Sequence, residues 1–364
     1  MIRQLRSHIP IAAPARREAA DGTEPPLRIV LGFEPRWFHV RCGVDFGERW
    51  HRDPEYRRAT LLSMRAELQR AFPCTSQWSG EEARDVNTIA GCFGVGVMPA
   101  VFGMPLRFYP DRWPHPEPGH ELSDAAIEAL DPARLLASPF VTELLEQVEA
   151  IEGRRGPVYG DLNWQGVLNT AFHLRGQQIF IDMLERPGFA ARLFDVIAET
   201  TIGLARMVQQ RQRQSGFAID WMCVSNCTLS MISPAMYRRM LLPLDARIAR
   251  AFERFGVHTC NWDATPYLSA LRELPCVGYI DMGAETRLAT AKALFPEARR
   301  AVLFTPGKLA ETVGAIEWMQ RIWRELSPCD VVVADIPWDM PDASANEFLR
   351  LAQGISENQG SRGW

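Results

Sequence analysis

Near its end the chain reads Arg300-Ala301-Val302-Leu303-Phe304, then a helical pattern from Leu309 to Leu326, then Asp330-Val331-Val332-Val333-Ala334. The two short segments are apolar and rich in β-branched residues, which predicts buried strands. A buried strand, a helix and a second buried strand form the unit from which parallel sheets are built. This stretch therefore predicts a parallel sheet covered by helices.

The same alternation of strand and helix extends back along the chain. Six strand-helix units follow residue 157, with strands predicted at 157–160, 217–222, 256–260, 277–282, 300–304 and 330–334. Arg28 to Phe33 and a segment within Gly94 to Phe102 add two more strands. Eight such units predict an α/β fold, a (β/α)8 TIM barrel, whose chemistry lies at the carboxyl ends of the strands. We expect one barrel domain over 28–358, preceded by an N-terminal extension, a loose tail over residues 1–27.

The composition excludes several classes of protein. The 364 residues are 47% hydrophobic and carry a formal net charge of -4, so the sequence has no basic footprint for nucleic acid. No run of 18 apolar residues is present, and a membrane-spanning helix is therefore not expected. The eight cysteines are scattered and form no compact framework, which favours reduced thiols in a cytoplasmic protein.

The stretch Gly256-Val257-His258-Thr259-Cys260-Asn261 predicts a buried strand that runs into a loop. Residues two apart on a strand point to the same face, so His258 and Cys260 are expected side by side. Imidazole and thiolate are ligands that suit zinc. The alternative interpretation is a small buried cysteine beside a hydrogen-bonded core histidine, because two ligands do not hold a metal.

Further polar residues are expected at the same rim. Asp281 and Asp335 each follow an apolar strand, where an acid needs a partner, a metal or a substrate. With His258 and Cys260 they form a candidate four-ligand metal site. Asp161, Asn163, Gln165 and Asp220 are candidate catalytic or substrate-orienting residues, although Asp and Asn also cap helices and tie loops routinely.

The N-terminal stretches Glu34 to His39 and Asp45 to His51 mix aromatic and charged residues. They are interpreted either as a binding loop at the mouth of the site or as side chains that pack the extension onto the barrel. In the first interpretation Arg36, Trp37 and His39 contact the substrate.

Residues 156–355 resemble the uroporphyrinogen decarboxylase superfamily, which includes corrinoid and coenzyme M methyltransferases. Ile232-Ser233-Pro234-Ala235-Met236-Tyr237 with Leu242-Pro243 is similar to its ISPEMY…LPY segment, and Gly160 to Gly176 to its glycine-containing strand-loop-helix. The stretch 256–261 is similar to the HxCG zinc motif of the methyltransferases. Ile336-Pro337 with Asn346-Glu347 is similar to the closing segment of the family.

The departures from the family bear on function. Phe33 to Trp37 does not match the arginine-rich MRQAGRY motif of true uroporphyrinogen decarboxylases, so that activity is not expected. The resemblance places a third zinc-ligating cysteine just before the closing Ile-Pro, where this chain has Ala334 and Asp335. Asp335 is expected to substitute as an oxygen ligand, and Asp281 falls near an acidic ligand of the related methionine synthases.

The resemblance implies a zinc-dependent methyltransferase that moves a methyl group between a small substrate and a methyl-corrinoid protein or a folate. The rival enzyme is a metal-free decarboxylase or lyase in which Asp220 or Asp161 stabilises a cationic intermediate and Arg36 or Arg41 holds a carboxylate. A barrel that binds a small molecule without turnover is the third hypothesis. A homodimer is expected only by analogy with the family.

Overall fold

The computed structural model describes residues 19–22, 24–73, 86–309 and 312–360. Its main sheet has the strand order β1-β8-β7-β6-β5-β4, and every neighbouring pair is parallel. The strands are β1 (Leu27–Phe33), β4 (Trp221–Ser225), β5 (Arg254–His258), β6 (Val277–Gly283), β7 (Arg299–Phe304) and β8 (Cys329–Ile336). A short antiparallel pair, β2 (Leu106–Arg107) and β3 (His115–Pro116), lies apart from this sheet.

Two further segments extend the sheet beyond β4 through single bridges. Gln165 pairs in parallel with Ser225 at the end of β4, and Thr88 pairs in parallel with Tyr159. The segments near residues 88 and 159–165 therefore take the places of the two remaining strands of an eight-membered barrel. The predicted (β/α)8 fold is confirmed in this form, although the expected strand within Gly94 to Phe102 is wrong. That stretch instead forms a 3-10 turn and helix α4 (Val97–Val101).

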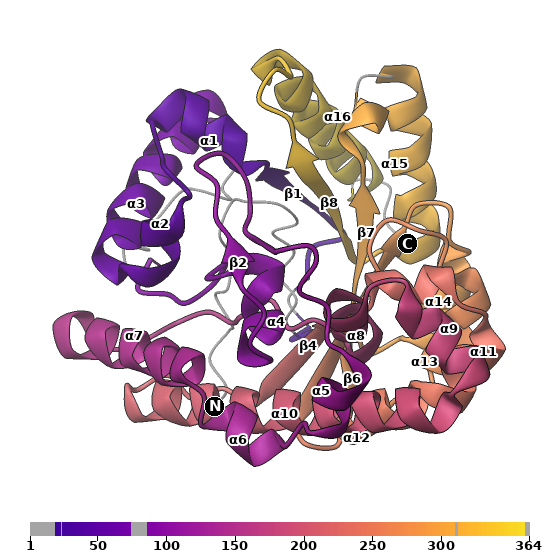
Figure 1. Cartoon of the computed structure of the whole chain (residues 1–364). Coiled ribbons are helices and arrows are strands. Elements are labelled where there is room, and N and C mark those ends of the chain that lie inside the picture. Colours follow the sequence, from indigo (N-terminus) through magenta and orange to yellow (C-terminus); the bar gives the residue numbers. More distant parts are fainter. Residues whose placement is uncertain (1–18, 23, 74–85, 310–311, 361–364) are drawn as a thin grey trace.

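Helices surround the strands (Figure 1). In that view α10 (Pro187–Gln214) runs along the lower edge, while α15 (Thr312–Leu326) and α16 (Asp342–Gly360) stand at the upper right beside β7 and β8. The remaining helices are α1 (Pro35–Cys42), α2 (Glu48–Arg52), α3 (Pro54–Ala71), α5 (Asp124–Glu128), α6 (Pro132–Leu136), α7 (Pro139–Arg155), α8 (Val167–Arg175), α9 (Gln178–Glu185), α11 (Pro234–Met240), α12 (Leu242–Ala249), α13 (Leu268–Leu271) and α14 (Leu288–Leu294).

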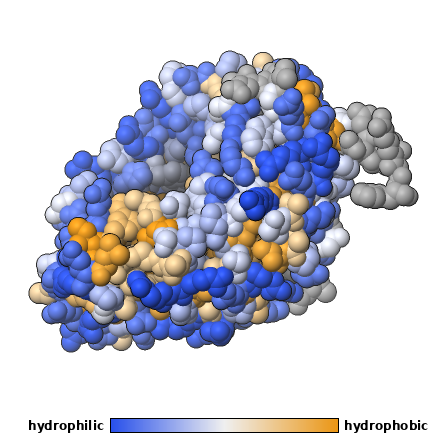
Figure 2. Space-filling view, turned by 90° about the vertical axis from the view of Figure 1, so that its right-hand side faces the viewer, coloured by the Kyte–Doolittle hydropathy of each residue, from blue (hydrophilic) through white to orange (hydrophobic). Residues whose placement is uncertain are grey.

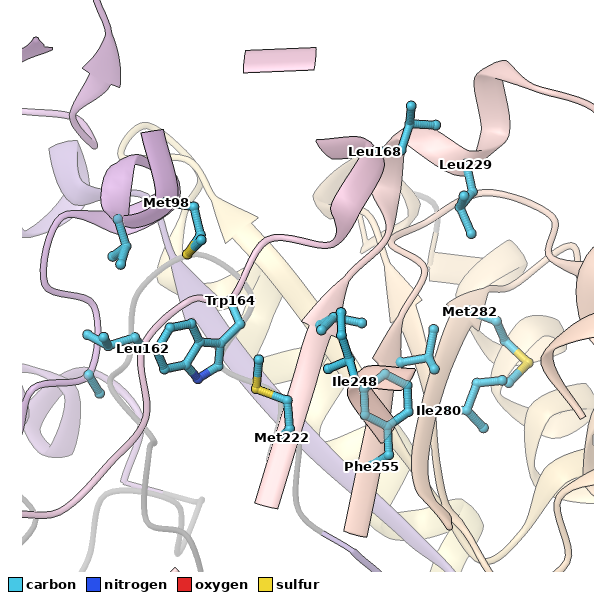
Figure 3. Packing of buried hydrophobic residues seen from close by; sticks show 14 of the residues in the cluster. Met98, Leu162, Trp164, Leu168, Met222, Leu229, Ile248, Phe255, Ile280 and Met282 are labelled. Atoms are coloured by element: carbon cyan, nitrogen blue, oxygen red, sulfur yellow. The ribbon is translucent and has the colours of Figure 1, made fainter. Parts of the chain in front are cut away.

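Side chains alternate between the two faces of each strand, as the pleat requires. One face packs under the helices: Met222, Phe255 and Ile280 of three successive strands belong to this large cluster, and Figure 3 shows them near Ile248 of α12. The opposite face fills the barrel with a smaller cluster that includes Tyr279, Leu303 and Val332. Because apolar side chains fill the middle of the barrel, polar side chains on this inner face are expected at its two ends.

One further predicted element differs from that observed. The strand expected at 217–222 begins four residues later, at Trp221, because Phe217 and Ile219 pack inside the barrel without joining a ladder. After β4 the chain forms two helices, α11 and α12, before it enters β5. Ser233 caps the first of these helices, since its side chain accepts a hydrogen bond from the Met236 backbone.

Part of the predicted tail is held against the barrel. The Ala20 backbone nitrogen donates to the Gly278 carbonyl, and Glu24 pairs with the buried Arg299 at 2.9 Å. Residues 1–18 lie outside the described residues. Among those described, no helix has the length and apolar character to cross a membrane.

The face of the molecule in Figure 2 is largely hydrophilic, with some apolar areas. Figure 2, which faces the right-hand side of Figure 1, shows apolar residues gathered beside hydrophilic ones on that face. The exposed large apolar side chains of the described residues are Val40, Ile181, Leu184, Met231 and Trp338. A homodimer stays a prediction.

Candidate metal centre

Three side chains at the carboxyl ends of neighbouring strands lie in one layer. The register pairs Ser225 of β4 with His258 of β5, and His258 with Asp281 of β6. All three side chains are buried. Because they occupy paired positions on parallel strands, they point to the same face of the sheet, which is the barrel interior.

Two cysteines lie in the next layer toward the rim. Cys227 follows Ser225 by two residues, and Cys260 follows His258 by the same interval. The ligating atoms of Cys227, His258 and Cys260 all lie within 4.8 Å of one another. His258 is buried and both cysteines are half-buried, so the group faces the mouth of the barrel while remaining partly shielded from water.

His258 is fixed by a carboxylate beneath it. Its Nδ1 lies 2.6 Å from Asp281 Oδ2, and an ionised carboxylate only accepts, so Nδ1 carries the proton. Asp281 also accepts hydrogen bonds from the Thr259 backbone nitrogen at 2.8 Å and from the Tyr279 hydroxyl at 2.8 Å. This contact engages Nδ1, so Nε2 is the ring nitrogen through which His258 would ligate a metal, as in other metal-binding histidines.

Cys260 reaches the group through an uncommon backbone conformation. The strand ends at His258, and Cys260 adopts a left-handed φ of 72° rather than continuing it. A non-glycine residue in this region costs free energy, and such residues gather at functional sites. A hydrogen bond with Cys227 lowers the pKa of the Cys260 thiol, His258 lowers it further, and burial opposes both effects. Thiolate is the form of cysteine that binds metals.

Asp335 lies near this group but outside the cluster of three. It also has a left-handed φ, of 55°, at the end of β8. Its pKa is raised, first by desolvation and then by the charges of Cys260 and Glu34. Asp335 is exposed to solvent, in contrast to the buried His258.

The structure adds one residue to the predicted ligand set. Asp281 lies outside the group of three and accepts hydrogen bonds at both carboxylate oxygens, one of them from His258, so it supports the imidazole; its role as a ligand stays a prediction. Cys227 was not among the expected ligands, although the sequence contains a pattern that points to it. Ser225-Asn226-Cys227 and His258-Thr259-Cys260 end adjacent strands with a cysteine at the same distance, and only the register between the strands reveals the match.

Asn163 and Gln165 form part of an interior amide network. Asn163 Oδ1 accepts hydrogen bonds from Gln165 Nε2 and from the Ser225 hydroxyl, both at 3.1 Å. Gln165 Oε1 accepts from Asn169 Nδ2 at 3.0 Å. Asp161 accepts from the Leu162 backbone nitrogen and from Trp164 Nε1. These contacts give the three predicted residues structural partners beside the metal group, and their roles toward a substrate stay predictions.

Asp220 does not lie at this rim. It immediately precedes the first residue of β4 and accepts a hydrogen bond from the Glu253 backbone at 3.1 Å, at the amino end of the sheet. There it borders a cavity of about 350 Å³ together with Arg206 and Arg213 of α10. The expectation that Asp220 acts with the rim residues is wrong, because the strand begins after it.

The N-terminal residues divide between core and surface. Trp37 is 0% exposed and packs against Phe33, so it is unavailable to a substrate and the predicted contact is wrong. His39 Nδ1 lies 2.9 Å from the Val44 carbonyl oxygen and serves the turn after α1. Arg36 is exposed, and its guanidinium lies 5.0 Å from the centre of the Trp338 ring.

Comparisons with known proteins agree with this fold. The sequence model of the family described as uroporphyrinogen decarboxylase (URO-D) matches residues 77–303, which is more than half of the chain. A methyltransferase from Methanosarcina mazei has a similar structure, with a TM-score of 0.62 and 14% sequence identity over 93% of this chain and 95% of that chain. At this identity the likeness shows the fold alone. No curated protein matches the sequence. The barrel, with its polar groups at the strand ends, is consistent with this family. Because the family model matches more than half of the sequence, the chain belongs to the uroporphyrinogen decarboxylase family.

Proposed function

We propose that this protein is a zinc-dependent methyltransferase-like enzyme that moves a methyl group between a small substrate and a corrinoid or folate carrier. The observation that carries the proposal is the group of two thiols and one imidazole with ligating atoms within 4.8 Å of one another. The structural likeness to a protein named a methyltransferase supports the same class of reaction.

The donor set fits zinc on chemical grounds. Two cysteines and a histidine are a ligand set found in catalytic zinc sites, which keep a further position open for substrate. His258 donates its Nδ1 proton to the Asp281 carboxylate, and zinc-binding histidines generally have such a carboxylate or carbonyl partner at the nitrogen that does not bind the metal. Zinc held here would lower the pKa of a substrate thiol or alcohol and so supply a nucleophile at neutral pH.

Residues of the chain have distinct tasks in this proposal. Cys227, Cys260 and His258 hold the metal, and Asp281 keeps the imidazole in the ligating tautomer. Asp335, whose charge interacts with that of Cys260, would accept a hydrogen bond from the incoming substrate.

The rival decarboxylase receives less support. It relies on Asp220, which lies at the other end of the sheet, and on arginines that bind a carboxylate substrate. Arg41 is already paired with Asp342 at 2.6 Å and with Glu67 at 3.4 Å. Asp161 likewise serves its own loop.

Metal content tests the proposal directly. We expect purified protein loaded with zinc to hold about one ion per chain by elemental analysis, in line with a single ligand group. Cys227→Ala, His258→Ala and Cys260→Ala should each lose it. Cys42→Ala is the matched control, because Cys42 is equally half-buried but lies in α1, outside the group. A wild-type protein that cannot be loaded would refute the proposal.

Turnover provides the second part of the test. Zinc-loaded protein is mixed with methylcobalamin and a panel of small thiols and alcohols, and loss of the methyl group is followed by the change in corrin absorbance. Transfer that requires zinc and fails in Cys227→Ala supports the proposed reaction. Stoichiometric zinc with no transfer to or from any carrier would instead favour a binding protein.

A further inference from the structure

A buried polar cluster lies beneath the loop that carries Cys227. Asn226 Nδ2 donates to Asp245 Oδ2 at 2.9 Å, and the Tyr237 hydroxyl donates to the same oxygen at 3.0 Å. Asn226, Tyr237 and Asp245 are each at most 1% exposed. Tyr237 and Asp245 come from α11 and α12, which follow β4 in the chain, so the helices that cover the barrel reach the residue next to the candidate ligand.

This cluster is costly to bury. The groups that touch the Asp245 carboxylate are a neutral amide and a neutral phenol, and a carboxylate removed from water without a cation is destabilising. Desolvation raises the pKa of Asp245 to about 7, while the hydrogen bonds from Tyr237 and Asn226 oppose that shift. An apolar residue at this position would avoid the penalty, so an acid here indicates a role other than filling space in the core.

Asn226 is also fixed from its other sides. Its backbone nitrogen donates to the His258 carbonyl at 2.7 Å, which ties it to the strand of a second ligand. Across the side chain, Gly166 approaches so closely that an added Cβ would lie 1.8 Å from Asn226 Oδ1. Just after Cys227, the Thr228 backbone donates to Asn169 Oδ1 at 2.9 Å. The residues on both sides of Cys227 are therefore held by buried partners.

We propose that Asp245 and Tyr237 are positioning residues for the metal centre, which act through Asn226 to hold the Cys227 thiol beside His258 and Cys260. The inference rests on the proposed zinc site. In this inference α11 and α12 do more than pack against the barrel, because they also fix the position of one metal ligand. Neither Asp245 nor Tyr237 touches the metal group itself.

The test removes the support while leaving the ligands intact. Asp245→Ala deletes the acceptor, and Gly166→Ala displaces Asn226 from the opposite side. Asp245→Asn keeps an oxygen that accepts from both donors and serves as the conservative rescue. Gly188→Ala is the matched control for the glycine change, because nothing lies within 4 Å of its added Cβ. Tyr237→Phe is a milder variant that removes a single hydrogen bond.

Zinc affinity and cobalt absorption are the first readouts. Removing residues that orient metal ligands typically weakens metal binding about 10- to 100-fold, and we expect the same loss of zinc affinity in Asp245→Ala and Gly166→Ala. Their cobalt forms should show the thiolate-to-metal band of one cysteine instead of two. Asp245→Asn and Gly188→Ala should resemble the wild type, and Tyr237→Phe should fall between. A purely structural role would lower thermal stability without changing the cobalt band.

Alkylation of the metal-free protein provides a readout that needs no zinc. Peptide mapping after a short iodoacetamide pulse should show faster modification of Cys227 in Asp245→Ala and Gly166→Ala than in the wild type. Unchanged alkylation and a full two-thiolate cobalt band in folded variants would overturn the inference while leaving the zinc proposal intact. A wild-type protein that binds no metal, but whose variants still alkylate faster at Cys227, would refute the zinc proposal and keep the positioning role.

Discussion

Replacing Asp281 by asparagine changes one atom and disturbs three hydrogen bonds. Oδ2 accepts from His258 Nδ1 and from the Tyr279 hydroxyl, while Oδ1 accepts from the Thr259 backbone. Asparagine has a single acceptor oxygen, so its amide group must face at least one of these donors. If the amide faces His258, the imidazole proton moves to Nε2 and the nitrogen needed for zinc is blocked.

The size of the effect follows from the contacts. Loss of the group that hydrogen-bonds to a metal-binding histidine typically weakens metal binding about 10- to 100-fold, which corresponds to about 1.4–2.8 kcal/mol. A buried donor left without an acceptor costs roughly 1–3 kcal/mol of folding free energy in addition. Asp281 is 0% exposed, so water cannot replace the lost acceptor.

Competition with a chromogenic chelator measures zinc affinity, and denaturant unfolding of the metal-free protein measures stability. Tyr279→Phe is the control, because it removes one donor to Asp281 and leaves the His258 contact in place; its zinc affinity should stay near the wild-type value. An Asp281→Asn protein that binds zinc as tightly as the wild type would refute the reasoning that this carboxylate sets the His258 tautomer.

Three further outcomes are expected. Trp37→Ala should lower the free energy of unfolding by about 3–5 kcal/mol, measured in denaturant, with zinc content unchanged, because the side chain is core and not a substrate contact. His51 is buried and its pKa is lowered from 6.5 to about 3, mainly by desolvation. The unfolded chain therefore binds the proton first as the pH falls, and His51 should cost about 1.4 kcal/mol of stability between pH 7.5 and 5.5. This pH dependence should be smaller by that amount in unfolding curves of His51→Gln, and an identical slope in both proteins would contradict it. Asp335→Asn should keep its zinc but raise KM or lower kcat in the methyl-transfer assay; loss of zinc would show that Asp335 is a ligand after all.

Strand periodicity was sufficient to predict the barrel, because buried parallel strands are nearly continuous apolar runs. It placed His258 and Asp281 near strand ends correctly, since each bears the last inward-facing side chain of a clear strand. Cys227 was not predicted as a ligand, because only the pairing of β4 with β5 brings it next to His258. A motif read along one chain segment cannot show which residues two neighbouring strands bring to the same height.

Burial was the other quantity that the sequence left undetermined. Trp37 and Arg36 are adjacent in a stretch of mixed character, yet the first is enclosed and the second is exposed. Asp220 was misplaced because Phe217 and Ile219 have the composition of a strand but pack inside the barrel before the first ladder begins. In both cases, contacts between distant segments decided the outcome.

Backbone pairing around the barrel is uneven, and this has a consequence for its fluctuations. Continuous ladders join β1 to β8 and onward to β4, whereas single bridges at Thr88 and Gln165 mark the other wall in the described residues. Amide hydrogens exchange by opening of the local structure, and segments with few backbone bonds open most readily. Amides near residues 88 and 159–165 should therefore exchange much sooner than those of β5 and β6. We therefore expect His258 and Asp281 to lie in a slowly exchanging part of the fold, next to a wall of the barrel, beginning at Gln165, that opens more readily.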